Sequence, residues 1–318
     1  MLVLVGLAGV LIARVWTDQT LEPLQSPVQD ALTLSIGLLV ESLPFIILGI
    51  GLSIVVQVFV PDSWLVRWLP RNPFRRRAVI SLFGMFLPVC ECGNVPLARG
   101  LMGRGYSVGD SVAFLLAAPI VNPVTIITTH QAFGFDDGIL VARLLAGYAI
   151  ANLVGWLLSL HPQPELLLTR KFARECRPPG DPKDQTKLVQ VGHMFYTESA
   201  TLMPALIVGS LVAGFIQVGV SREALITLGT DPIIGVLAML FLAFVISVCA
   251  NVDAFFILPF AQTFLPGSLV AFLVFGPLVD IKMLSLLRTT YAGRTVGVIA
   301  GVVGLASLSL GMVMNYVG

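Results

Sequence analysis

Long apolar stretches separated by short polar ones dominate the chain and predict a series of membrane-spanning helices. An α-helix needs about 20 apolar residues to cross a bilayer. The predicted spans are Ala31–Val60, Ser111–Phe133 with an interruption at Ala118–Pro123, Ile139–Leu160, Phe195–Val220, Ser268–Arg288 and Thr295–Val317. Met1–Trp16 lacks the basic start and the small-residue cleavage site of a signal peptide, so we expect a short retained anchor or first span.

The stretch Pro88–Pro96 interrupts an apolar segment with polar residues. It contains two prolines, a glycine, and a glutamate between two cysteines. Proline lacks the backbone donor and glycine loses the most backbone entropy, so both residues break a helix. A bilayer tolerates broken backbone only where protein buries it or where it lines a wet cavity. A carboxylate between two thiols at such a break therefore indicates a functional site.

The composition indicates whether this chain is surrounded mainly by water or by lipid. Apolar residues make up 56% of it and charged residues 12%, against about 25% charged residues in soluble domains. The mean hydropathy is +0.91. We therefore expect an integral membrane protein. The net charge of +1 gives no indication of a nucleic-acid partner, and four cysteines are too few for a disulfide scaffold.

Two basic loops predict the orientation. Residues 61–77 and residues 161–189 are rich in arginine and lysine, which places both loops in the cytoplasm. Between these loops, Ser111–Phe133 then runs outward and Ile139–Leu160 runs back inward. Ala78–Arg104 must therefore enter and leave the membrane on the cytoplasmic side. We expect a re-entrant hairpin there, with its tip at Cys90–Asn94. Arg99 and Arg104 are expected to be cytoplasmic anchors.

The second half of the chain repeats the first. The matched positions are Glu41 with Glu198, Pro44 with Pro204, Gly49 with Gly209, Cys92–Val95 with Cys249–Val252, and Ala118–Asn122 with Gly276–Asp280. An odd number of predicted crossings separates the halves, so the repeats should lie in opposite orientations. Pro232–Phe264 would then form a second hairpin, entered from outside.

The predicted fold is an all-α polytopic membrane protein with two inverted repeats. Each repeat contributes a re-entrant broken-helix hairpin, and an extra span precedes them. The predicted divisions are an N-terminal span and polar connector (residues 1–29), a first repeat (30–160), a cytoplasmic loop (161–189) and a second repeat (190–318). Secondary transporters use facing broken hairpins to build a midplane site with alternating access. The architecture therefore argues for transport.

Four motifs also carry a family resemblance. They are Cys92–Leu101, Ala117–Pro123, Cys249–Phe255 and Phe275–Lys282. Together they resemble the predicted permease family that includes YraQ-type permeases and the ArsP organoarsenical efflux permeases. The resemblance implies that Cys90, Cys92 and Cys249 hold a trivalent metalloid. The chain departs from the commonest family pattern at Glu91, where a small residue is usual, and at Asn251, where an acidic residue is common.

Buried polar residues near the breaks are the candidate site. The expected substrate-binding residues are Cys90, Glu91, Cys92, Asn94, Asn122, Cys249, Asn251, Asp253 and Asp280. Thiolates suit soft metals and metalloids, and intramembrane carboxylates are costly unless they have a function or a partner. The coupling candidates are Glu41, Glu91, Glu198, Asp253, Asp280 and Lys282. The alternatives are helix packing for the cysteines, backbone capping for Glu41 and Glu198, and an ion pair with Lys282 or Arg288 for Asp280.

The sequence therefore predicts a multi-pass permease of the inner cell membrane that moves a small solute between the two hairpin tips. The expected cargo is a trivalent organoarsenical or another thiol-seeking species. A small sulfur-containing or anionic solute and a soft metal ion are the alternative cargoes. A membrane thiol enzyme and a passive channel are the alternatives from other classes. We expect the lipid bilayer as surroundings, a homo-oligomer as an option, no cofactor and no nucleic acid.

Overall fold

A computed structural model describes residues 26–60, 70, 72–86, 89–135, 138–176, 187–219 and 231–317. These residues are helical apart from turns and one isolated antiparallel bridge between Leu168 and Tyr291. The all-α class predicted from the sequence is therefore confirmed for the described part. The expected first span, Met1–Trp16, lies outside the described residues, as do residues 61–69 and 71 of the predicted loop 61–77.

Long apolar helices agree with the predicted spans. They are α2 (Ser26–Phe59), α8 (Ile139–Ser159), α10 (Lys187–Gly219) and α16 (Gly293–Val317). Together with the segment Pro266–Thr290, five helical segments in the described part of the chain are long and apolar enough to cross a membrane, and a bent pair makes up to six. Large apolar side chains such as Val40, Val208 and Leu305 point outward from these helices, as expected for surfaces that face lipid.

Shorter helices end and restart inside the apolar regions. They are α5 (Glu91–Gly103), α6 (Val108–Val121), α7 (Pro123–Phe133), α12 (Ile234–Ile246), α13 (Asp253–Ile257), α14 (Pro266–Leu278) and α15 (Ile281–Thr290), and a 3₁₀ turn, η3 (Leu258–Gln262), follows α13. The predicted interruption near Asn122 is confirmed, because α6 and α7 meet there at 40°. Nearly every residue of α5, α6 and α14 is buried, so the broken helices form the centre of the molecule.

Two breaks follow a proline and are capped by the side chain at the break. Pro119 and Pro277 lie within the last turn of α6 and α14. The Asn122 side chain accepts a hydrogen bond from the backbone of Val124, and Asp280 accepts one from the backbone of Met283. Such caps satisfy amide donors that the first turn of a helix leaves free.

The expectation of a loop as far as Arg77 is wrong. Helix α4 (Pro73–Ser81) begins at Pro73, with Asn72 as its N-cap, and a 3₁₀ turn, η1 (Leu82–Phe86), continues it. Proline suits the first helical position because the missing N–H is not needed there. Arg76 in this helix binds the buried Asp110 of α6 at 2.7 Å. The second basic loop also contains short elements, η2 (Pro164–Leu167) and α9 (Arg170–Glu175).

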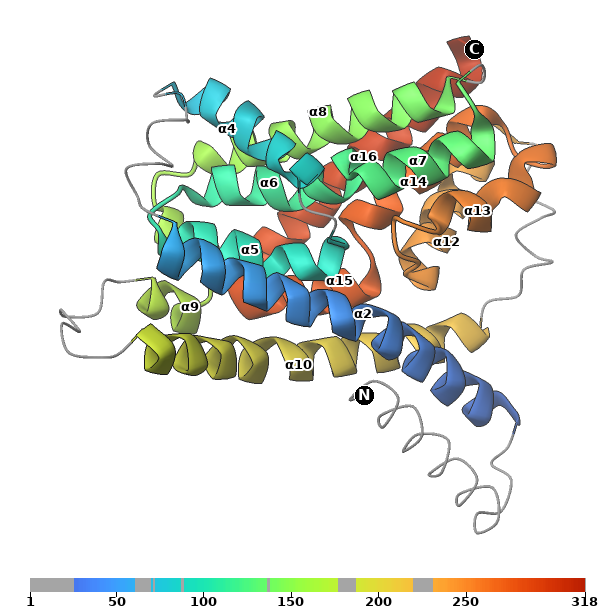
Figure 1. The fold of residues 1–318 in the computed structure, drawn as a ribbon. Coiled ribbons are helices and arrows are strands. Elements are labelled where there is room, and N and C mark those ends of the chain that lie inside the picture. Colours follow the sequence, from blue (N-terminus) through green and yellow to red (C-terminus); the bar gives the residue numbers. More distant parts are fainter. Residues whose placement is uncertain are drawn as a thin grey trace.

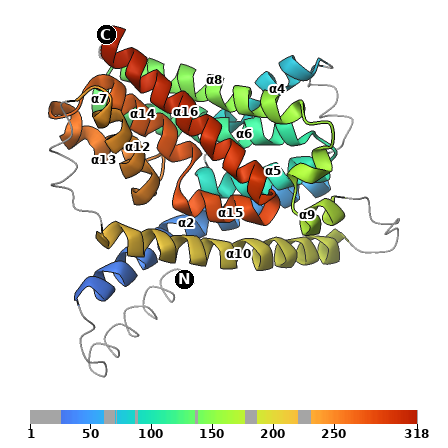
Figure 2. The ribbon, with the colours of Figure 1, turned by 180° about the vertical axis from the view of Figure 1, so that it is seen from behind.

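The helices pack so that the broken ones lie between the long ones. Figures 1 and 2 show α2 and α10 side by side along one side of the molecule, with α5 and α15 next to them and α8 and α16 on the far side. Helices α2 and α5 touch at Gly49 and Gly93. A Cβ on Gly49 would lie 2.1 Å from the Gly93 carbonyl oxygen. Glycine is therefore required at this crossing for the backbones to approach so closely.

Candidate functional site: a buried thiol–lysine cluster

The chain segments at the helix breaks meet in the centre of the molecule. The Asn122 amide donates to the carbonyl of Val89 at 3.0 Å, which joins the break before α7 to the break before α5. Thr125 of α7 donates to the side chain of Asn251, in the segment between α12 and α13, at 3.2 Å. Segments far apart in sequence therefore come together at one place.

Three cysteines and a glutamate line this place. Cys90, Cys92 and Cys249 are unbridged and buried. The thiols of Cys90 and Cys249 and a carboxylate oxygen of Glu91 all lie within 4.8 Å of one another. The Cys249 thiol donates to Glu91 Oε2 at 3.5 Å. Two thiols and a carboxylate at this spacing form a set of donors that suits a soft metal ion or a metalloid.

Lys282 supplies a buried positive charge to the same group. Its Nζ lies 3.5 Å from Glu91 Oε1 and 3.4 Å from the carbonyl oxygen of Ser247, and the residue is 1% exposed. Cys92 and Asp280 also lie within electrostatic range of its ammonium. We call Cys90, Glu91, Cys92, Cys249 and Lys282 the thiol–lysine cluster. A buried charge is tolerated only when it is paired, so Lys282 and Glu91 stabilise each other.

Other predicted residues surround the cluster in different ways. Asn94 is fully buried, and neither its amide nitrogen nor its carbonyl oxygen has a hydrogen-bond partner. One oxygen of the buried Asp280 caps α15 while the other has no hydrogen-bond partner. Asn251 is partly buried. Glu41 on α2 is also partly buried and lies within electrostatic range of Lys282 and Glu91.

Asp253 belongs to a separate ion pair. Both of its oxygens bind the Arg143 guanidinium, at 2.9 and 2.6 Å, and Arg143 is fully buried. Arg143 also donates to Thr129 at 2.7 Å. Sequence reasoning missed Arg143, although a lone arginine within the apolar segment Ile139–Leu160 was the signal that could have found it.

Glu198 also has an arginine partner. Arg99 of α5 binds Glu198 at 2.8 Å and Glu175 of α9 at 3.2 Å. The guanidinium lies 4.2 Å from the centre of the Phe172 ring. Arg99 is only 2% exposed, so the residue expected to be a cytoplasmic anchor is buried, and its guanidinium nitrogens are hydrogen-bonded to other side chains. Glu198 and Glu41, which the predicted repeat pairs with each other, therefore have different environments.

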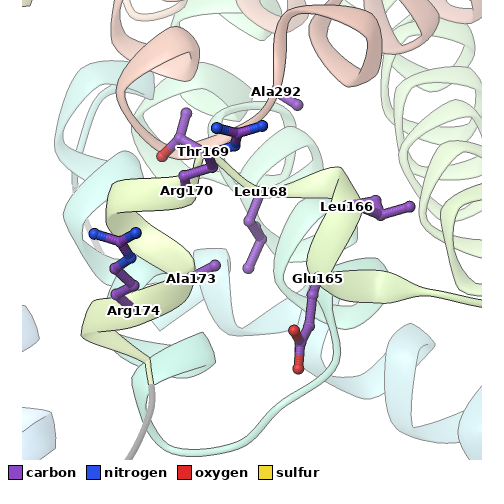
Figure 3. A pocket seen from close by; sticks show the side chains of 8 residues that line it. All are labelled: Glu165, Leu166, Leu168, Thr169, Arg170, Ala173, Arg174 and Ala292. Carbon is purple, nitrogen blue, oxygen red and sulfur yellow. The ribbon is translucent and has the colours of Figure 1, made fainter.

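A surface cavity lies outside the cluster. It has a volume of about 570 Å³ and is lined by Glu165, Leu166, Leu168, Thr169, Arg170, Ala173, Arg174 and Ala292 (Figure 3). These residues come from the connector between the predicted repeats and from the turn before α16. The cavity shares no residue with the thiol–lysine cluster.

The helical composition, the membrane-length helices and the buried polar centre define a polytopic membrane protein. Comparison with known proteins goes further. Residues 28–316 match the ArsP_1 family model, which is described as a predicted permease. The chain therefore belongs to this family of predicted permeases, and membership indicates a transporter rather than an enzyme.

Several named relatives support this assignment. The chain is 34% identical to UPF0718 protein YcgR of Bacillus subtilis over 82% of its own length and 88% of the relative. It is 30% identical to a Streptococcus mutans protein, provisionally named as a subunit of a two-component membrane permease complex, over 84% and 89% of the two chains. UPF0718 protein YraQ of Escherichia coli is 31% identical over 36% of this chain and 32% of its own. No solved structure matches the chain.

Proposed function

We propose that this chain is a secondary-type permease that moves a thiol-seeking solute, such as a trivalent organoarsenical, through the thiol–lysine cluster. The observation that carries the proposal is the meeting of two thiols and a carboxylate within 4.8 Å at the broken ends of buried helices. Sulfur ligands bind soft, thiol-seeking species, and buried broken backbone provides polar groups at membrane depth. A permease needs both features at one point.

We further propose that residues 30–160 and 190–318 are inverted repeats with re-entrant hairpins over Ala78–Arg104 and Pro232–Phe264. Matching residues have matching roles: Asn122 and Asp280 each cap the helix after a proline-containing one. Matching glycine contacts also occur. Gly109 of α6 touches Gly155 of α8, and Gly267 of α14 touches Gly311 of α16. Such correspondence is expected when two halves share one fold.

Charge within the cluster supports a role for protons in transport. Glu91, Asp280 and Lys282 are each 1% exposed, and Glu41 lies nearby. A trivalent arsenical that bonds to a thiol sulfur exchanges an As–OH bond for an As–S bond, and its hydroxide leaves with the thiol proton as water. The adjacent carboxylates are the groups that can accept that proton from the thiol and pass it to the hydroxide. We propose Glu91 as the first acceptor because it already accepts a hydrogen bond from Cys249.

An alternative cargo has one specific observation in its favour. Lys282 and the N-termini of α5 and α15 come together at the cluster, and helix N-termini attract anions. A small sulfur-containing anion would use these groups together with the thiols. The two adjacent carboxylates oppose it, which is why the thiol-seeking cargo is our first proposal.

The proposed function also implies a location, an orientation and a partner for the chain. We propose that the chain lies in the inner cell membrane with residues 61–77 and 161–189 in the cytoplasm, since both segments are basic. The Streptococcus relative is named as one of two components. A second protein subunit is therefore a candidate partner, in addition to a homo-oligomer.

Accumulation of arsenicals in arsenic-sensitive cells tests the cargo. Cells that express the wild type should accumulate less methylated trivalent arsenical, while Cys90→Ser and Cys249→Ser should lose this effect. Cys176→Ser is the matched control, because this cysteine lies at the end of α9, outside the cluster. The proposed cargo is wrong if the wild type reaches the membrane and leaves accumulation unchanged. Thiosulfate uptake by the wild type and by Lys282→Met would then test the anionic alternative.

A further inference from the structure

We propose that Arg99–Glu198 and Arg143–Asp253 are two gates, one on each side of the thiol–lysine cluster, that open in turn during transport. This inference rests on the proposed permease function, since only a transporter needs a site that opens to each side separately. Each gate is a buried ion pair that joins the two proposed repeats. We call them the Arg99 gate and the Arg143 gate.

The Arg99 gate joins α5 to elements that follow the first proposed repeat. Besides Glu198 on α10, Arg99 binds Thr290 at the end of α15 at 3.1 Å and Glu175 on α9 at 3.2 Å. Phe172, also on α9, covers the guanidinium and is 4% exposed. Among the described residues, every partner of Arg99 lies outside the first repeat. Separation of the repeats at this end must therefore break these contacts.

Helix α9 is attached so that it stays with this gate. The backbone of Thr169 donates to the Thr290 carbonyl at 2.9 Å, and Ala292 donates to Leu167 at 2.9 Å. The connector is thus held to the end of α15 by backbone bonds, while Arg99 is held to it by side chains alone. The side-chain contacts are the ones that can open without unfolding.

The Arg143 gate joins α8 to the second proposed hairpin. Arg143 binds the Asp253 carboxylate with both of its terminal nitrogens and lies 3.4 Å from the carbonyl oxygen of Ala250. Asp253 follows Cys249 by one turn, and its backbone N–H donates to the Cys249 carbonyl at 3.1 Å. Movement of this carboxylate is therefore transmitted to a thiol of the cluster.

The two gates lie on opposite sides of the cluster. Arg99 is about 13 Å along α5 from Cys90, at a rise of about 1.5 Å per residue. Figures 1 and 2 show α9 at one end of the molecule and α13 at the other, with α5 and α15 extending from the centre towards the α9 end. The Arg99 gate is thus at the α9 end and the Arg143 gate at the α13 end.

Alternation follows from the electrostatics of these pairs. Separation of a buried pair leaves two unpaired charges at low dielectric, which is strongly unfavourable unless water enters. Opening one gate admits water at that end, while the other pair remains dry and closed. Opening both at once would leave four charges unpaired and would provide a continuous wet path. The arrangement therefore favours states in which at least one gate is closed.

The ion pair of Arg76 and Asp110 provides a matched control. Asp110 is fully buried and lies 2.7 Å from Arg76, a distance similar to those within the gate pairs, and the Arg76 side chain is 30% exposed. Both residues lie in the first proposed repeat, on α4 and α6. Loss of this pair removes a buried charge contact without releasing one repeat from the other.

The test is the rate at which a membrane-impermeant thiol reagent labels the cluster cysteines from each face. The background carries Cys176→Ser, and right-side-out and inside-out vesicles present the two faces. Glu198→Gln should speed labelling about tenfold or more from the α9 face alone. Asp253→Asn should do so from the opposite face alone, and Asp110→Asn should change neither rate.

Equal acceleration from both faces, no acceleration in either gate variant, or the same acceleration in Asp110→Asn would overturn the proposal. A gate variant that fails to reach the membrane is replaced by Arg99→Lys or Arg143→Lys, which keep the charge and lose the bidentate fork, with the same expected direction. Labelling requires neither cargo nor transport. Its failure therefore leaves the arsenical proposal standing, and failure of the arsenical assay leaves the gates standing.

Discussion

Replacement of Lys282 by methionine removes the cation that balances the centre of the molecule. The distance of 3.5 Å between Lys282 Nζ and Glu91 Oε1 corresponds to an attraction of about 5 kcal/mol at an effective dielectric constant of about 20. Removal of one partner of a buried pair costs about 3–5 kcal/mol in other proteins. We therefore expect Lys282→Met to lower the free energy of unfolding by about 3–5 kcal/mol.

A double-mutant cycle isolates the ion pair from other effects of the substitution. Glu91→Gln alone should also destabilise, because it leaves Lys282 without its closest carboxylate. The double variant should be more stable than the sum of the two single effects predicts, by about 2 kcal/mol or more, because neither charge is then left alone. Reversible unfolding of the purified protein in detergent, followed by circular dichroism, measures all four free energies.

The exposed Lys171 provides the control for this cycle. It donates to Thr201 at 3.3 Å on the surface, so Lys171→Met should change the free energy of unfolding by about 0.5 kcal/mol or less. Additivity of Lys282→Met and Glu91→Gln to within about 0.5 kcal/mol would refute the reasoning, since it would mean that the two charges do not stabilise each other.

Two further predictions concern packing and reactivity. Gly49→Ala should destabilise the protein by about 1–3 kcal/mol because the added Cβ would collide with Gly93. Gly51→Ala, whose Cβ would have nothing within 4 Å, should be neutral or stabilising by up to about 1 kcal/mol. Equal effects of the two substitutions in a thermal unfolding assay would contradict the close crossing of α2 and α5. Burial raises the pKa of the Cys176 thiol above its ordinary value, so less thiolate is present at a given pH and its maleimide-labelling profile should lie at higher pH than that of free cysteine. A profile at or below that of free cysteine would show that the side chain is open to water.

Residue order along the chain predicted the helix break at Asn122, and the repeat match paired that position with Asp280. The break expected across Pro88–Pro96 does not extend past Cys90, because α5 runs from Glu91 through Pro96 to Gly103. Pro119 and Asn122, or Pro277 and Asp280, act within one turn of each other, and proline removes a backbone donor wherever the chain folds. Their effect is local, so it can be read without a fold. The same holds for the long apolar stretches, because the number of apolar residues needed to cross a bilayer depends on helix rise alone.

Candidate cysteines were also accessible to sequence reasoning, but their mutual distances were not. Cys90 and Cys92 are neighbours in sequence, and Cys249 was selected through its repeat match. The structure brings Cys249 to Glu91 at 3.5 Å. The sequence indicated Lys282 only as a coupling candidate, whereas the structure shows that it is the charge partner of Glu91. This role depends on how α15 lies against α5.

The sequence by itself determined the membrane surroundings, the helical class and the break at Asn122, since each depends on composition or on residues within a few turns. Only the tertiary structure decided which buried charges are paired. Arg143 with Asp253, and Arg99 with Glu198, are separated by 110 and 99 positions in the chain. An ion pair depends on a distance of a few ångströms between side chains, and for such partners that distance is set by helix packing rather than by any local pattern.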